Sequence, residues 1–350
     1  MKYVKHVTPV LPRQAQGITS IVYREAAHEM GRLPEPVAVF SPHLDLLTAT
    51  WATLRESLVV GSAPRGLKEA VAATVAADLC CPWCVDAHTT MLYATGHAAA
   101  AESLLQSTTR TADDPAAVYI AWTRAASRLP TAAAVVTPFP QHQRAEFVGT
   151  LVEFHFLARA VRVLLDETFL PGGPRLQRLT RRLAGWALAG KAQARHAPGR
   201  AADRLAEQPL PADMEWAIGS AHIARAFAGL AAVLDRPDHL SLEARQRVVG
   251  VVEQWTGEDQ GLSAAWVTPY ITDLPEQEQP AARLALLTAL APFQVSDDVV
   301  RAARGSLPTD HALVAAIAWS AFLAARRVGS WAGSPERLHA KQVPVLSPAG

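Results

Sequence analysis

Four residues in one segment of the chain combine the side chains that thiol redox chemistry needs. Cys81 and Cys84 form a Cys-x-x-Cys pair, His88 follows Cys84 by four residues, and eleven residues separate Glu69 from Cys81. A thiol pair can cycle between dithiol and disulfide, and a carboxylate and an imidazole can move a proton to or from sulfur. The segment therefore predicts a redox site in which Glu69 and His88 assist the two thiols.

Two consecutive helices are expected to position these groups. Pro82 suits the first position of a helix, so Cys81 lies near the N-cap and Cys84 in the first turn, where the helix dipole predicts a lowered thiol pKa. His88 then lies on the same helix face as Cys84. A break near residues 79–81 would fold the preceding helix back and bring Glu69 to His88. The alternative for Glu69 is a surface carboxylate beside Lys68.

Cys80, the third cysteine, is expected to be a packed thiol. In a helical backbone its side chain would point about 100° away from the pair. A zinc site can be drawn with Cys80, Cys81, Cys84 and His88, but adjacent cysteines rarely point at one metal and no distant second pair exists. We therefore expect no metal.

The rest of the chain predicts an all-α fold. Apolar residues return every three or four positions, and alternating β patterns bounded by hairpin signals are hard to find. Helices are predicted over residues 46–59, 66–79, 82–95, 114–126, 143–165, 176–194, 214–233, 242–255, 279–290 and 310–328.

A weak internal repeat predicts two helical units in tandem. The Phe-Leu-Ala of residues 156–158 returns at 322–324, and the segment around Glu69 is echoed around Glu243, although unrelated amphipathic helices can also coincide this well. The second unit has no cysteine, so it would be a degenerate copy. The predicted domains are an N-terminal extension (1–32), a redox domain (33–172), a basic helical linker (173–212), the degenerate repeat (213–335) and a C-terminal tail (336–350). The linker is expected to present a solvated basic face, or alternatively a docking surface for an acidic partner.

Composition excludes several classes of protein. With 33 basic and 32 acidic residues the formal charge is +1, which argues against nucleic-acid and membrane-surface partners. No signal-peptide core and no apolar run of about 18 residues are apparent. All three cysteines fall within residues 80–84, which excludes a disulfide-stapled secreted fold. We expect a cytoplasmic protein.

The spacing of Glu69, Cys81, Cys84 and His88 resembles the signature of the alkylhydroperoxidase D (AhpD-like) branch of the carboxymuconolactone decarboxylase family. The stretch from Glu153 to Arg159 also resembles the helix that closes this unit in the family, and the similarity runs from about residue 33 to residue 170.

The resemblance implies an all-helical peroxidase that reduces organic hydroperoxides. Cys84 would become a sulfenic acid, Cys81 would resolve it to a disulfide, and Glu69 with His88 would move the proton; the residues alone leave open which thiol attacks first. It implies no bound cofactor, an external thiol or lipoyl protein as reductant, and a possible homo-oligomer. Trp83 and His155 are candidates for the wall of the active cavity, with a hydrogen-bonded core histidine as the alternative for His155.

Other functions fit parts of the pattern. A protein disulfide oxidoreductase could use the same thiols, and a helical interaction protein could sense oxidants through them without turnover. Lactone decarboxylation is disfavoured because that branch of the family does not depend on a cysteine pair. Hydroperoxide reduction is the leading hypothesis because the four-residue spacing matches throughout.

Overall fold

Helices make up the regular secondary structure of the chain. The computed structural model describes residues 1–106, 114–132, 134–166, 168–170, 172–236 and 240–333. Within these ranges β pairing is confined to an isolated antiparallel bridge between Val4 and Leu165. The all-α prediction is confirmed, and the predicted tail (336–350) lies outside the described residues.

Each predicted helix has a counterpart in the structure. These helices are α3 (Leu44–Leu54), α4 (Arg65–Asp78), α5 (Pro82–Ala94), α7 (Ala117–Ala126), α9 (Arg144–Leu164), α10 (Pro174–Gln193), α11 (Ala221–Leu234), α12 (Leu242–Gln254), α14 (Gln279–Leu290) and α16 (Asp310–Ala332). The single helix expected over 214–233 is wrong in one respect. Met214 has non-helical backbone angles, so a 3₁₀ segment, Ala212–Ala217, precedes α11.

Several further helices were not predicted. They are α1 (Gly17–Met30), α2 (Glu35–Ala38), α6 (Ala98–Gln106), α8 (Leu129–Ala132), α13 (Thr268–Ile271) and α15 (Asp297–Ala303), together with a π-helical segment, Arg55–Val59, that continues α3. Further 3₁₀ segments lie at Pro12–Gln14, Gln141–Gln143, Ala202–Arg204, Ala264–Val267 and Pro292–Gln294.

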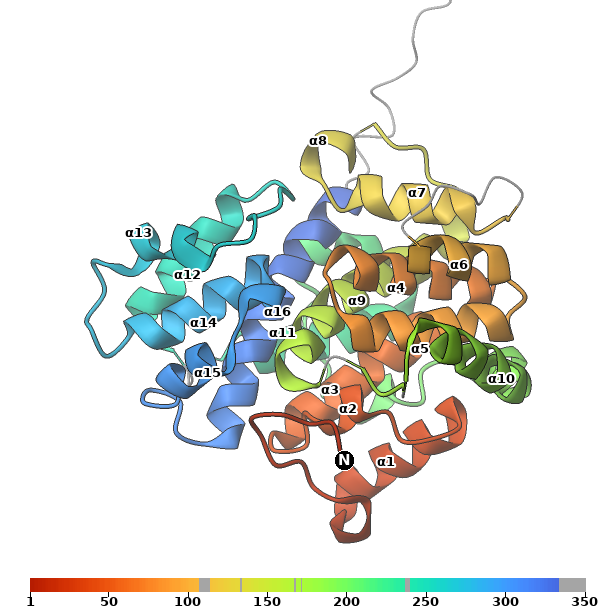
Figure 1. Cartoon of the computed structure of the whole chain (residues 1–350), viewed down its shortest axis with the longest axis horizontal. Coiled ribbons are helices and arrows are strands. Elements are labelled where there is room, and N and C mark those ends of the chain that lie inside the picture. The colour runs from red at the N-terminus through yellow and green to blue at the C-terminus, as the bar shows by residue number, and fades with distance from the viewer. Residues whose placement is uncertain (107–113, 133, 167, 171, 237–239, 334–350) are drawn as a thin grey trace, which may run out of the picture.

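Two long helices, α9 and α16, pack against each other at the centre of the molecule (Figure 1). The helices α12 to α15 lie on one side of this pair, and α4 to α7 with α10 lie on the other (Figure 1). The rings of Phe156 on α9 and Phe322 on α16 meet edge to face, with centroids 5.7 Å apart. The residues that the repeat aligns therefore meet in the core, and the tandem origin of the two units stays a prediction.

Helix α16 is long and apolar. Within the described part of the chain it is the helix whose length and composition would suffice to cross a membrane. However, 78% of its most apolar window is buried inside the fold. Its apolar surface packs against α9 and α14, so burial in the protein core accounts for its composition.

The turn between α4 and α5 explains the position of Cys80. The N–H of Cys81 donates to the carbonyl of Ala76 at 2.9 Å, and the N–H of Cys80 donates to that of Ala77 at 3.1 Å. This is the Schellman pattern, which closes a helix around one left-handed residue. That residue is Cys80, with φ of 51°. Its side chain is exposed, so the prediction of a packed thiol is wrong because the local backbone is not helical.

Glu153 on α9 is a fully buried acid. Neither of its carboxylate oxygens has a hydrogen-bond partner among the described residues. Burial raises the pKa of Glu153 from its ordinary 4.5 to about 8. The side chain is therefore mostly a neutral carboxylic acid in the folded protein at pH 7.

Glu153→Gln is expected to stabilise the fold at neutral pH. Between the unfolded pKa of 4.5 and the folded pKa of about 8, the folded chain holds a proton that the unfolded chain has released. The free energy of unfolding therefore falls as pH rises, by up to about 1.4 kcal/mol per pH unit. Glutamine does not titrate, so the gain at pH 7 should be on the order of 3 kcal/mol. Denaturant unfolding between pH 5 and pH 8 measures it, and parallel pH profiles for the two proteins would contradict the assignment.

Candidate active site

The helical hairpin of α4 and α5 joins the acid and the imidazole of the predicted site. The Oε2 atom of Glu69 lies 2.6 Å from Nδ1 of His88. Glu69 is fully buried, so the alternative of a surface carboxylate beside Lys68 is wrong. Because the ionised carboxylate accepts a hydrogen bond from the Nδ1–H group, Nε2 is the ring nitrogen left to accept or return a proton.

Arg65 is a second partner of Glu69 that the sequence analysis missed. Its Nε atom lies 2.6 Å from Oε1 of Glu69, one helical turn away on α4. Burial alone would raise the pKa of Glu69, but Arg65 and His88 outweigh burial and hold this pKa below its ordinary value. Glu69 is thus ionised at neutral pH. The i,i+4 spacing of arginine and glutamate was the available signal.

The two thiols of the pair are in contact. Cys81 is the N-cap of α5 and Pro82 is its first residue, as predicted. The two Sγ atoms lie 2.8 Å apart. Cys81 is fully buried and Cys84 is 4% exposed. The pair is therefore placed to close to a disulfide in a site with little access from solvent.

The acidity of Cys84 differs from the expectation. Burial, followed by the hydrogen bond and charge of Cys81, raises the pKa of Cys84 well above its ordinary value. The prediction of a lowered pKa is therefore wrong for this thiol. The helix dipole favours the thiolate, but the loss of water around the sulfur is the larger effect here. Cys84 needs a base to release its proton.

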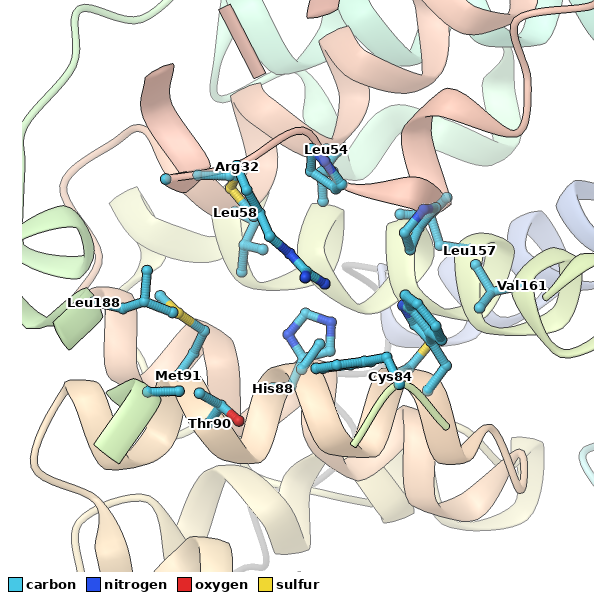
Figure 2. A pocket seen from close by; sticks show the side chains of 18 of the residues that line it. Arg32, Leu54, Leu58, Cys84, His88, Thr90, Met91, Leu157, Val161 and Leu188 are labelled. Carbon is cyan, nitrogen blue, oxygen red and sulfur yellow. The ribbon is translucent and has the colours of Figure 1, made fainter. Parts of the chain in front are cut away.

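A cavity of about 370 Å³ opens beside the pair. Cys84, His88 and Trp83 are among the residues that line it, and Cys81 and Glu69 are not. Figure 2 shows Cys84 and His88 extending from α5 into the same space. A ligand in this cavity would therefore meet the sulfur of Cys84 and the ring of His88, with Cys81 behind them.

The walls of the cavity come from segments far apart in the sequence. Residues between Met30, at the end of α1, and Pro36, in α2, contribute one wall, and α10 contributes another. Leu54, Leu58 and Leu157 add apolar surface from α3, the π segment and α9. The wall residues up to Arg32 lie in the predicted N-terminal extension, and α10 lies in the predicted linker. No local pattern marks them as parts of a site, because only tertiary packing brings them together.

The two residues named as possible cavity walls lie in different places. Trp83 lines the cavity and packs against Phe169, with ring centroids 4.6 Å apart. His155 is not among the lining residues of the described chain. Its Nε2 lies 2.9 Å from Oγ of Ser127, and its Nδ1 lies 2.7 Å from Nη1 of Arg159. Burial, and then Arg159, lower the pKa of His155, as befits a neutral core histidine.

No metal cluster is found around these residues. Within the described ranges no group of three or more His, Cys, Asp or Glu side chains has an arrangement that could hold a metal ion. Cys80, which the zinc alternative requires, is exposed on the outer side of the turn. The described side chains that meet at this site are two thiols, an imidazole and a carboxylate.

A buried ion pair fastens α10 over the site. Asp86, which lies between Cys84 and His88 on α5, is 3% exposed. It accepts hydrogen bonds from Arg181 on α10 and from the Thr168 hydroxyl. The basic linker is thus partly buried, and this pair holds the wall formed by Ala184 and Leu188 against α5.

Arg181→Ala is expected to lower the free energy of unfolding by about 3–5 kcal/mol, because Asp86 would stay buried without its counter-ion. Arg178→Ala is the matched control on the same helix. Arg178 pairs with Glu102 while 46% exposed, so its removal should cost about 1 kcal/mol or less. Denaturant unfolding compares the two variants, and equal losses would contradict the role given to Arg181.

Comparison with known proteins identifies the family of the chain. No family model matches the chain. The chain is 54% identical over 334 residues to a Mycobacterium tuberculosis protein named alkyl hydroperoxide reductase Rv2159c. The match covers 95% of this chain and 96% of that relative. With such identity over nearly the whole of both chains, the protein belongs to the AhpD-like family of alkylhydroperoxidase oxidoreductases.

Proposed function

We propose that the protein reduces organic hydroperoxides through a dithiol–disulfide cycle of Cys84 and Cys81, with His88 and Glu69 as the proton relay. The observation that carries this proposal is the 2.6 Å contact between Glu69 and His88, which holds the imidazole in the wall of the cavity that Cys84 also lines. The name of the relative, alkyl hydroperoxide reductase, supports the same reaction class.

The first step oxidises Cys84. His88 accepts the thiol proton at Nε2 while Glu69 stabilises the imidazolium through Nδ1. The thiolate attacks the terminal oxygen of the hydroperoxide, a sulfur–oxygen bond forms and the oxygen–oxygen bond breaks. The departing alkoxide takes a proton from His88 and leaves as an alcohol. Cys84 is then a sulfenic acid.

The second step closes the disulfide. The sulfur of Cys81 attacks that of Cys84, a sulfur–sulfur bond forms, and hydroxide leaves with the Cys81 proton as water. The balance is one hydroperoxide and two thiols in, and one alcohol, one water and one disulfide out. Contact between the two sulfurs favours fast closure, and the position of Cys84 in the cavity wall supports it as the first thiol to react.

A reductant must then restore the dithiol. Because Cys81 is fully buried and Cys84 is 4% exposed, a slim dithiol such as a lipoyl group fits this access better than the surface of a folded protein. A reducing cytoplasm would supply such thiols. The same burial disfavours general exchange with protein disulfides.

Turnover with two kinds of oxidant tests the proposal. Consumption of cumene hydroperoxide, with dihydrolipoamide as reductant, should be saturable and far faster than oxidation of the enzyme by a protein disulfide such as that of insulin. If insulin is reduced readily while the hydroperoxide is left intact, the protein is a disulfide oxidoreductase and the proposed function is wrong.

A further inference from the structure

The cavity beside Cys84 carries a single permanent charge. Among the described residues that line it, Arg32 is the one arginine or lysine, and no aspartate or glutamate joins it. The other lining side chains are mostly apolar, including Leu54, Leu58 and Leu188. A hydrocarbon chain would bury itself here, with each buried methylene strengthening binding about fourfold.

The guanidinium of Arg32 packs on an aromatic ring and has no ion-pair partner among the described residues. Its Cζ atom lies 5.1 Å from the ring centroid of Phe169, and Phe169 in turn packs on Trp83, next to Cys84. No ion pair within the described ranges involves Arg32, and its donors stay available to a ligand. Figure 2 shows the side chain reaching into the cavity over His88.

Two other polar groups of the cavity already have partners. Nδ1 of His88 is hydrogen-bonded to Glu69, and the Thr90 hydroxyl donates to the carbonyl of Asp86 at 2.7 Å. Glu35 interacts electrostatically with Arg32, but it is not among the described residues that line the cavity. An anionic group brought by a ligand would therefore find Arg32 without a competing carboxylate among the described residues of the cavity wall.

We propose that Arg32 binds the carboxylate of an amphipathic substrate, so that the cavity selects hydroperoxides of fatty acids over neutral hydroperoxides. The acyl chain would lie along the apolar wall and present its hydroperoxide to Cys84. A cavity of about 370 Å³ suits one acyl chain and not a two-chain phospholipid. The inference rests on the proposed function for the hydroperoxide, and on Arg32 alone for the carboxylate.

Arg32→Gln tests the inference through a ratio of substrates. The wild-type enzyme should turn over the hydroperoxide of linoleic acid with kcat/KM about tenfold above that of its methyl ester. In Arg32→Gln this ratio should fall to near one, through KM, and Arg32→Lys should keep part of it because the charge remains. Arg13→Gln, an exposed arginine outside the cavity, is the control and should keep the wild-type ratio.

Binding of a carboxylate without a peroxide separates this inference from the proposed function. Calorimetry should find that laurate binds the reduced wild-type protein about tenfold more tightly than dodecanol, and that Arg32→Gln removes the difference. If laurate keeps its advantage but no hydroperoxide is turned over, the carboxylate site stands and the proposed function fails. The role of Arg32 is overturned if the wild-type protein has the same kcat/KM for the acid and the methyl ester and binds laurate and dodecanol with the same affinity.

Discussion

Replacing Cys84 with serine is expected to lower hydroperoxide turnover by about 10³-fold or more, because a hydroxyl cannot replace the thiolate as nucleophile toward the oxygen–oxygen bond. Cys84 is the thiol that lines the cavity, so its loss should remove even the first equivalent of hydroperoxide consumed. Stopped-flow mixing of reduced enzyme with excess cumene hydroperoxide measures that first equivalent.

Cys81→Ser gives the matched comparison. It should lose steady-state turnover but still consume one equivalent, because Cys84 can form a sulfenic acid that nothing then resolves. A sulfenic-acid trap such as dimedone should label Cys84 in this variant. Cys80→Ser should turn over at close to the wild-type rate, since Cys80 lies exposed outside the cavity. The opposite result, a first equivalent in Cys84→Ser and none in Cys81→Ser, would reverse the assigned order.

The second large effect is expected for Glu69→Gln, with a loss of about 10²-fold or more in the rate of Cys84 oxidation. The amide keeps the shape of the side chain, but it cannot stabilise an imidazolium at His88 as the carboxylate does across 2.6 Å. The loss should depend on the leaving group. Peroxyacetic acid releases a stable carboxylate that needs no proton, so the relay should matter much less for it than for cumene hydroperoxide.

This comparison separates proton transfer from structural support. If Glu69→Gln slows both oxidants equally, Glu69 acts only by holding the fold. The contribution of Glu69 to the free energy of unfolding also depends on pH in a defined direction. The pKa of Glu69 is lowered from 4.5 by Arg65 and His88 despite burial, so its stabilising effect is complete above pH 4.5 and is lost as pH falls through the folded pKa. Glu69→Gln should lack this acid-side loss of stability.

Local sequence patterns were sufficient to predict the helical hairpin of α4 and α5, which carries the thiols. Pro82 marks the first turn of a helix, and the spacing of Glu69, Cys84 and His88 places them on facing helices; the structure has both features. The same rules failed where burial or backbone geometry decides. The helix dipole argued for an acidic Cys84, whereas desolvation raises its pKa. A helical backbone was assumed at Cys80, whereas a left-handed residue ends α4 there.

The rest of the site depends on tertiary packing. Arg32 follows α1, and Leu188 belongs to a helix far along the chain, yet both line the cavity with Cys84. The Asp86–Arg181 pair that fastens α10 joins residues with no sequence relation. Signals of period three or four predict helices and their apolar faces, but they do not say which faces meet.

The most direct test of the thiol cycle is a count of thiols after one turnover. The fully reduced protein is mixed with one equivalent of cumene hydroperoxide, quenched with an alkylating reagent and digested for mass spectrometry. The account predicts that two of the three thiols of the chain are lost, that a disulfide joins Cys81 to Cys84, and that Cys80 is alkylated. Three alkylated cysteines, with the hydroperoxide unchanged, would contradict it.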